Sequence, residues 1–405
     1  MVTSTPVHLT VEDRARWLSQ AYTFDATVWL VEAGQAKLTD FSLQGLRYLS
    51  PEDGVQLVKR YHDLVQQEME YRSALDVALA EAASGSTDVS EGLQSVQEEQ
   101  EAIQLVAEGV LQRQASAILQ ANGLDTAGVV FPPLTFHFSE LPMALIVSPR
   151  NAIQQDANIL LDPDMSIEEQ IQLEIAVESA MDVSALVVGI GGLGYYPTMV
   201  METTSMSWIA EVIIHEWVHN FLDLRPLGMH YNTSPELRTM NETAANLIGK
   251  TFGALLIEEY YPEWAPQMPV EAAGHPGETT QAEEPVVFDF RLEMYITRLE
   301  VDRLLALGEV EAAEEYMEQR RLVFVDNGYP IRRLNQAYFA FHGAYADEGV
   351  SAAGEDPVGE AVRQLWAQSE SPADFLRTIA WMDSYDDLLV ELARIGGAMP
   401  ASPAP

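Results

Sequence analysis

The segment 215–219, which reads HEWVH, constrains the fold of this 405-residue chain more than any other part of it. It lies within residues 205–224, where apolar residues recur at spacings of one, three and four and predict a buried helix. Side chains four residues apart stand one above the other on a helix, so His215 and His219 project from the same face. Glu216 follows about 100° round the helix, at the rim of that face. The sequence therefore predicts that the two imidazoles hold one metal ion beside a carboxylate.

A candidate for a third ligand lies in a second predicted helix, which begins near residue 239 and runs to about residue 260. Glu242 lies near the start of this helix, and Asn246 follows one turn later. Two imidazole nitrogens and one carboxylate oxygen leave one position of a tetrahedral zinc ion open, as a catalytic zinc site requires.

These two helices resemble those of the gluzincin metallopeptidases, the thermolysin-like and aminopeptidase class, in which a HExxH helix precedes a helix that carries a glutamate ligand. The resemblance covers residues 189–252. It implies that His215, His219 and Glu242 bind one catalytic zinc ion and that Glu216 is the general base. It also implies an enzyme, a zinc metallopeptidase, whose substrate is a peptide or protein.

The chain departs from that class at three points. Twenty-two residues separate His219 from Glu242, so the connecting loop at 226–238 is expected to be longer. Asn246 replaces the aspartate that usually supports a ligand histidine; an amide accepts the same hydrogen bond but tunes the imidazole less strongly. Asp223 is an alternative partner, or simply an exposed acid at a helix end. The Gly-x-Met-Glu-Asn motif of the aminopeptidases is absent, and exopeptidase and endopeptidase action both stay open.

Residues 189–194 read GIGGLG and fit the GxGxxG pattern of dinucleotide-binding folds. That pattern requires a helix at the third glycine, whereas residues 195–200 alternate as a strand does and contain a proline. Proline in such a run predicts an edge strand, so we expect a glycine turn and an edge strand beside the HExxH helix. In the gluzincins such a strand pairs with the substrate backbone, which implies that Gly194, Tyr195 and Tyr196 bind substrate. An ordinary hairpin is the alternative.

A predicted helix at 334–345 places aromatic side chains on one face. Peptide hydrolysis creates an oxyanion that a tyrosine hydroxyl or a histidine N–H can stabilise. The candidates, in order, are Tyr345 and His342, then His230 and Tyr231. Such a stripe also fits ordinary core packing, and both interpretations stay open. Two candidates for binding a substrate carboxylate, which are otherwise surface arginines, are Arg332 and Arg333.

The charge of the chain excludes two classes of partner. Sixty-two acidic residues against 22 basic ones leave a formal net charge of −40, which repels nucleic acid and anionic membrane surfaces. The chain has no cysteine and therefore neither a disulfide nor a thiolate nucleophile. No apolar run of about 18 residues is present, so we expect no direct membrane insertion. We expect a soluble protein of unknown compartment, or the extracytoplasmic domain of a membrane-anchored or exported protein.

We predict an α+β protein that is predominantly helical, with a small sheet whose edge strand lies beside the two-helix zinc site. Alternating apolar residues predict strands at 131–138, 144–147 and 159–161, and His137 in the first of them is expected to be structural. Helical periodicity predicts an N-terminal helical hairpin. The expected parts are an N-terminal helical domain at 1–128 and a catalytic core at 129–261. They are followed by a flexible acidic Pro/Gly linker at 262–287, a helical part that completes the catalytic domain at 288–398 and a disordered tail at 399–405.

The predicted function is zinc-dependent hydrolysis of peptide bonds, in which Glu216 takes a proton from the attacking water and passes it to the leaving amine. Two alternatives stay open. One is a catalytically silent, peptidase-like scaffold that binds a partner through its helical domain. The other is a zinc hydrolase that acts on a non-peptide amide. A purely structural zinc site is less compatible with the sequence, which offers no obvious fourth ligand.

Overall fold

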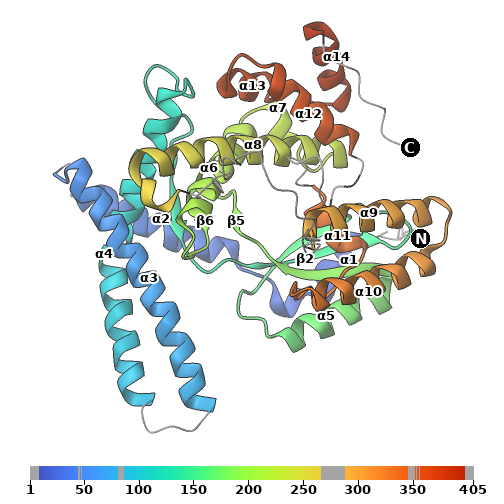
Figure 1. Cartoon of the computed structure of the whole chain (residues 1–405), viewed down its shortest axis with the longest axis horizontal. Helices are drawn as coiled ribbons and strands as arrows, with labels where there is room; N and C mark the ends of the chain where they lie inside the picture. Colours follow the sequence, from blue (N-terminus) through green and yellow to red (C-terminus); the bar gives the residue numbers. More distant parts are fainter. Residues whose placement is uncertain are drawn as a thin grey trace, which may run out of the picture.

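The structure, a computed structural model, describes residues 9–43, 46, 48–80, 86–265, 288–344, 352, 354 and 356–396. Helices dominate this part of the chain, and two small three-stranded sheets lie among them (Figure 1). The predicted α+β class, with a predominance of helix, is confirmed. The strands form two sheets where we expected one.

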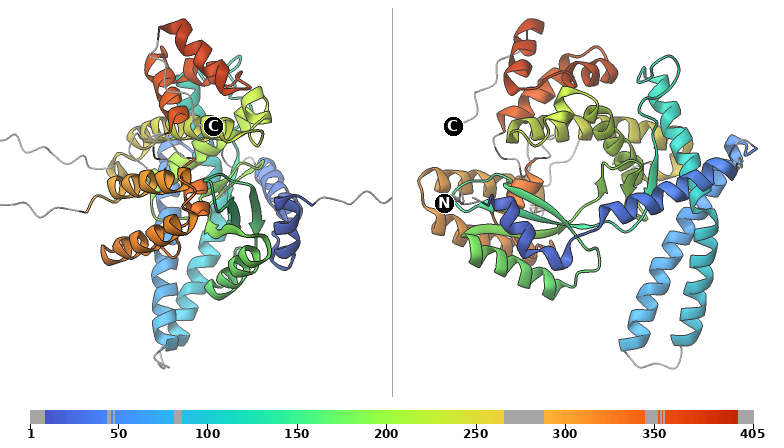
Figure 2. Two further views of the ribbon diagram at one scale, coloured as in Figure 1. Left: turned by 90° about the vertical axis from the view of Figure 1, so that its right-hand side faces the viewer. Right: turned by 180° about the vertical axis from the view of Figure 1, so that it is seen from behind.

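Two long helices near the N-terminus, α3 and α4, form the predicted antiparallel hairpin, which projects from the rest of the molecule in every view (Figure 1 and Figure 2). The hairpin shares a hydrophobic core with the HExxH helix, because Tyr61 and Leu111 belong to the same buried cluster as Ile209. The first helix, α1, packs elsewhere, against strand β3 and helix α5. The bounds are Val11–Leu18 for α1, Gln20–Tyr22 for the short 3-10 helix η1, Ala26–Leu43 for α2, Pro51–Ala80 for α3 and Ser86–Ala121 for α4.

The larger sheet is antiparallel, with the strand order β3-β2-β4. Alternate residues of the central strand face opposite layers of helix, as the two-residue period of a strand requires. Leu145 and Val147 belong to the cluster that includes α1 and α5, whereas Ile146 packs with Phe341 of helix α11. The bounds are Met143–Pro149 for β2, Ala157–Leu161 for β3, Ile167–Met181 for α5, Val183–Gly189 for β4 and Gln336–His342 for α11.

The smaller sheet has the order β1-β6-β5, from Phe136–Phe138, Thr198–Val200 and Gly192–Leu193 respectively. β6 pairs in parallel with β1 and antiparallel with β5. The prediction of an edge strand within residues 195–200 is therefore wrong: residues 198–200 form the central strand, and the glycine-rich β5 is the edge. The partner β1 comes from about 60 residues earlier in the chain, and local alternation carries no information about such a long-range pairing.

The HExxH helix, α6 (Met206–Asp223), packs along α8 (Pro235–Tyr260), and the short α7 (Pro226–Met229) connects them. Ser205 and Ser234 cap the two long helices by accepting backbone hydrogen bonds. The two helices approach closely where α8 carries glycine: a Cβ atom on Gly249 would lie 3.0 Å from the Cβ of His215. Close packing of this kind fixes how α6 and α8 face each other.

The C-terminal part of the chain contributes helices alone among its described residues. α9 and α10 form a second hairpin, and α12, α13 and α14 pack on α8. Most of the predicted linker, including His275, and the predicted tail at 399–405 lie outside the described residues. None of the described helices is long and apolar enough to cross a membrane. The bounds are Pro262–Trp264 for the 3-10 helix η3, Phe290–Ala306 for α9, Val310–Asp326 for α10, Pro357–Gln368 for α12, Pro372–Ile379 for α13 and Tyr385–Ile395 for α14.

Candidate metal centre

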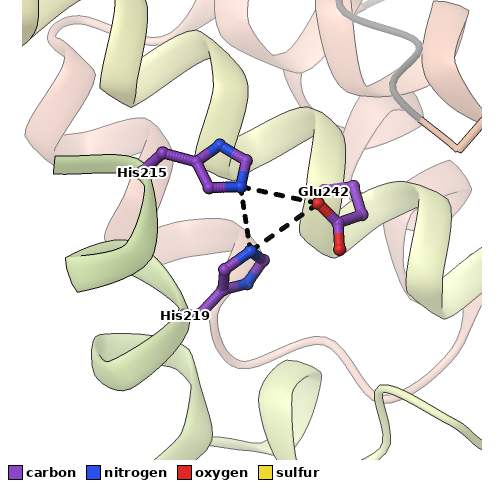
Figure 3. Close-up of side chains that lie close together, drawn as sticks. All are labelled: His215, His219 and Glu242. Atoms are coloured by element: carbon purple, nitrogen blue, oxygen red, sulfur yellow. Dashed lines mark hydrogen bonds and ion pairs between the residues drawn. The ribbon is translucent and has the colours of Figure 1, made fainter. Parts of the chain in front are cut away.

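Three side chains, two from α6 and one from α8, meet between these helices (Figure 3). The Nε2 atoms of His215 and His219 lie 3.0 Å apart. The Oε2 atom of Glu242 lies 3.6 Å from each of them. All three atoms therefore point at a common centre, as the sequence predicts for two imidazoles four residues apart and a carboxylate from a second helix.

The spacing of these three atoms fits a metal ion. Ligand atoms roughly 2.0–2.1 Å from a tetrahedral zinc ion are about 3.4 Å apart, and the observed separations of 3.0 and 3.6 Å lie on either side of that value. The Oε2 atom of Glu242 is buried and has no hydrogen-bond partner among the described residues. Because a buried charged oxygen is costly without a partner, the group of His215, His219 and Glu242 is suited to hold a cation.

The orientation of His219 is fixed by a residue that the sequence analysis did not select. Its Nδ1–H donates to the Oδ1 of Asn241, at 2.8 Å, so Nε2 is the nitrogen that can bind a metal in the neutral ring. Asn246 and Asp223 both line the adjoining cavity, but the partner of His219 is Asn241. Asn241 directly precedes Glu242, so the register of α8 against α6 decides which asparagine reaches the ring.

The second oxygen of Glu242 is occupied. The hydroxyl of Tyr231, which follows α7, donates a hydrogen bond to Oε1 of Glu242. Burial, together with the charge of Glu242, raises the pKa of the Tyr231 hydroxyl and keeps it a donor. Tyr231 therefore aligns the carboxylate so that Oε2 faces the two imidazoles.

Glu216 lies beside the triad, under the glycine-rich edge strand. A Cβ atom on Gly192 would stand 2.8 Å from the carboxyl carbon of Glu216, and one on Gly194 would stand 3.2 Å from the Cβ of His219. The glycines at these positions thus allow β5 to lie directly on the HExxH helix. Burial raises the pKa of Glu216, although the nearby His219 and His215 oppose this effect.

The charged side chains of this site shift one another's pKa values. Burial alone would lower the pKa of His219, but the adjacent Glu242 and Glu216 raise it to about 9. Burial alone would likewise raise the pKa of Glu242, whereas the two histidines hold it well below its usual value. Glu242 is therefore ionised near neutral pH, which is the form that binds a metal.

A cavity of about 470 Å³ opens beside these residues. Its walls include the glycine segment 189–194, the motif residues of α6, and Phe341 from α11. Gly194 lines this cavity, but Tyr195 and Tyr196 are not among its lining residues. The side chain of Tyr196 is half exposed, and the ring of Tyr195 packs near Trp29 of α2.

Two of the other oxyanion candidates, His342 and His230, do not line this cavity. His342 packs against Tyr338, with ring centres 4.3 Å apart, and burial lowers its pKa to about 4. The neighbouring Phe341 lines the cavity, because Phe341 lies on the face of α11 that packs against the sheet. Tyr345 lies outside the described residues. The imidazole of His230 is exposed, and its Nδ1 contacts the carbonyl of Pro226.

The two arginines considered for a substrate carboxylate have structural partners. Arg332 forms two hydrogen bonds with the fully buried Glu174, of 2.8 and 2.6 Å. Arg333 pairs with Glu178 and Glu174. These ion pairs join the loop before α11 to α5, so neither guanidinium is free to recognise a substrate.

No protein-family model, curated protein or solved structure matches this chain.

Proposed function

We propose that this protein is a zinc-dependent peptidase whose active site is the group of His215, His219 and Glu242 with Glu216 beside it. The observation that carries this proposal is the position of the buried, unpartnered Oε2 of Glu242, 3.6 Å from both histidine Nε2 atoms. Two nitrogens and one carboxylate oxygen are a common donor set of catalytic zinc. A bound zinc ion would act as a Lewis acid toward the scissile carbonyl and the attacking water.

Glu216 is the proposed general base. Its carboxylate takes a proton from the water that attacks the carbonyl carbon, and it then donates this proton to the nitrogen of the leaving amine. A pKa raised by burial suits this role, because a base works best when its pKa lies near the operating pH. The strand β5 covers the carboxylate and limits access of bulk water.

Two further observations support a peptide substrate. β5 pairs with β6 on one side only among the described strands, and its residues Gly192 and Leu193 line the cavity. An extended peptide can add to such an edge through main-chain hydrogen bonds. The cavity is also large enough for several side chains, since ligand pockets range from about 300 to 1,000 Å³.

The donor set favours a catalytic over a structural role. Structural zinc sites close their coordination with a fourth protein ligand, whereas the metal-ligating group has three members among the described residues. The three residues that would hold the metal line the cavity together with Glu216, which would allow a substrate to reach them.

The test is cleavage of a diverse peptide library by zinc-loaded protein, read by mass spectrometry. Glu216→Gln should bind zinc with the same stoichiometry and lose about 10²- to 10⁴-fold in rate, since it removes the base and spares the ligands. A matched control is Glu258→Gln, because Glu258 is an exposed carboxylate of α8, and this variant should cleave at the wild-type rate. Hydrolysis that survives in Glu216→Gln contradicts the mechanism, and absence of cleavage in every zinc-loaded protein contradicts the function.

A further inference from the structure

The charged residues that line the cavity are unequally divided between the two signs. Four of them are carboxylates, and one is a guanidinium, that of Arg238. Arg238 lies on α8 four residues, or about one helical turn, before Glu242, so both side chains leave the same face of the helix. The acids of the cavity are Glu211, Glu216, Asp223 and Glu242.

Arg238 is incompletely bonded. Its Nη1 donates to the carbonyl of Ala340 at 3.2 Å, and its guanidinium shares a hydrogen bond with the Tyr231 hydroxyl. The buried Nε has no hydrogen-bond partner, and no ion pair joins Arg238 to a carboxylate within the part of the chain that the structure describes. Among the described residues Arg14, Arg113 and Arg225 likewise bond to backbone carbonyls without an ion pair, and Arg238 is set apart by its position at the cavity.

Other arginines in this molecule show what a structural guanidinium looks like here. Arg332 and Arg333 lie about as close to the surface, and both pair with buried or half-buried glutamates of α5. Arg238 differs from them because it lines a cavity and forms no ion pair with a carboxylate of the described residues. A guanidinium presents its donors in a planar fork that matches a carboxylate, so the missing partner of Arg238 is an anionic oxygen pair.

We propose that Arg238 binds the C-terminal carboxylate of the peptide substrate, and that the protein therefore removes residues from the C-terminal end of peptides. This inference rests on the proposed peptidase function and specifies its substrate class. Arg238 and Glu242 are four residues apart, a rise of roughly 6 Å along the helix, and an extended peptide advances about 3.3–3.6 Å per residue. One or two residues of an extended peptide span such a rise, so the proposal places the bound carboxylate one or two residues beyond the scissile bond.

The experiment compares matched peptides that end in a free acid or in an amide, with wild-type, Arg238→Gln and Arg238→Lys proteins. Wild-type protein should cleave the free acid about 10- to 100-fold faster in kcat/KM, because the amide lacks the charge-assisted hydrogen bonds. Arg238→Gln should cleave both peptides at the same low rate, and Arg238→Lys should recover part of the preference. The matched control is Arg394→Gln, an exposed arginine of α14 that pairs with Glu391, and it should keep the full preference.

A purely structural Arg238 predicts a different result, in which Arg238→Gln slows both peptides by the same factor and the preference for the free acid persists. Internal cuts with no dependence on the C-terminal group would overturn the inference and leave the peptidase function intact. A binding measurement further separates the carboxylate site from the peptidase function, because zinc-loaded Glu216→Gln can be titrated calorimetrically with the same two peptides. The carboxylate site is supported, even where no cleavage occurs, if Glu216→Gln binds the free acid more tightly than the amide. The double variant Glu216→Gln, Arg238→Gln should lose this difference in affinity. Equal binding of the two peptides to Glu216→Gln overturns the carboxylate site.

Discussion

Two buried glutamates in this protein each contact histidine, and they differ in how their oxygens are used. Glu108 of α4 accepts from the backbone N–H of Phe138 at 2.8 Å, from Gln104 at 2.9 Å and from Nδ1 of His137 at 2.9 Å, and it pairs with Lys37. Glu242 of α8 accepts from Tyr231 through one oxygen, while its other oxygen has no hydrogen-bond partner among the described residues.

The difference separates a structural carboxylate from a ligand. Donors surround both oxygens of Glu108, so its burial is compensated within the fold. The other oxygen of Glu242 faces the Nε2 atoms of two imidazoles, and a metal ion can accept an electron pair from each of the three atoms. Both clusters thus place a histidine beside a buried glutamate. They differ in the number of carboxylate oxygens that accept a hydrogen bond, which is two for Glu108 and one for Glu242.

The largest expected effect tests the structural side of this comparison. Glu108→Ala leaves Lys37 and His137 without their buried partner and should lower the free energy of unfolding by about 3–5 kcal/mol. Urea denaturation of the metal-free protein measures this change. The zinc content per chain should stay at the wild-type value, and loss of zinc would contradict a purely structural role. The control is Glu101→Ala, because Glu101 is an exposed residue of the same helix.

The second prediction concerns the ligand side. Glu242→Gln should weaken zinc binding at least about 100-fold, because loss of a partner outside the ligand shell already costs 10- to 100-fold. Its metal-free form should lose less stability than Glu108→Ala, since glutamine has nearly the same volume and can still accept from Tyr231. Competition with a chromophoric chelator measures the affinity. Wild-type affinity in this variant would remove Glu242 from the ligand set.

The smallest expected effect comes from the partly buried carboxylate of Glu202, whose partners are the neutral donors Tyr61 and Gln100. Burial raises the pKa of Glu202, whereas His137 and Lys37 outweigh burial and lower the pKa of Glu108. A raised pKa in the folded state means that stability is fully present below the unfolded value and is lost as the pH rises through the folded value.

Glu202→Gln should therefore stabilise the protein at pH 8, by on the order of 1 kcal/mol, because glutamine stays neutral there. At pH 4 the carboxyl is protonated and the advantage should vanish. Urea denaturation at the two pH values measures both quantities. An equal effect at pH 4 and pH 8 would mean that ionisation of Glu202 does not limit stability.

Features whose partners are local in the chain follow from the sequence of this protein, and features with distant partners do not. The helix at 205–224 and the common face of His215 and His219 follow from a spacing of four residues, and both are confirmed. The sequence does not show that residues 198–200 are a central strand, because their second neighbour, β1, lies far away in the chain. The partner of His219, Asn241, could not be selected from the sequence, because helical periodicity gives no information about the rotation of α8 against α6.

The sequence by itself determined that two imidazoles and Glu216 share one helix surface, because covalent spacing and the helical period place them there without help from the rest of the chain. It also pointed to Glu242 as a carboxylate within reach. The tertiary structure alone decided which oxygen of Glu242 stays free, which asparagine orients His219, and that Arg238 faces the cavity while Arg332 and Arg333 pair with α5. Those outcomes depend on the packing of elements distant in sequence, where a side chain's role is set by the atoms that surround it and not by its neighbours along the chain.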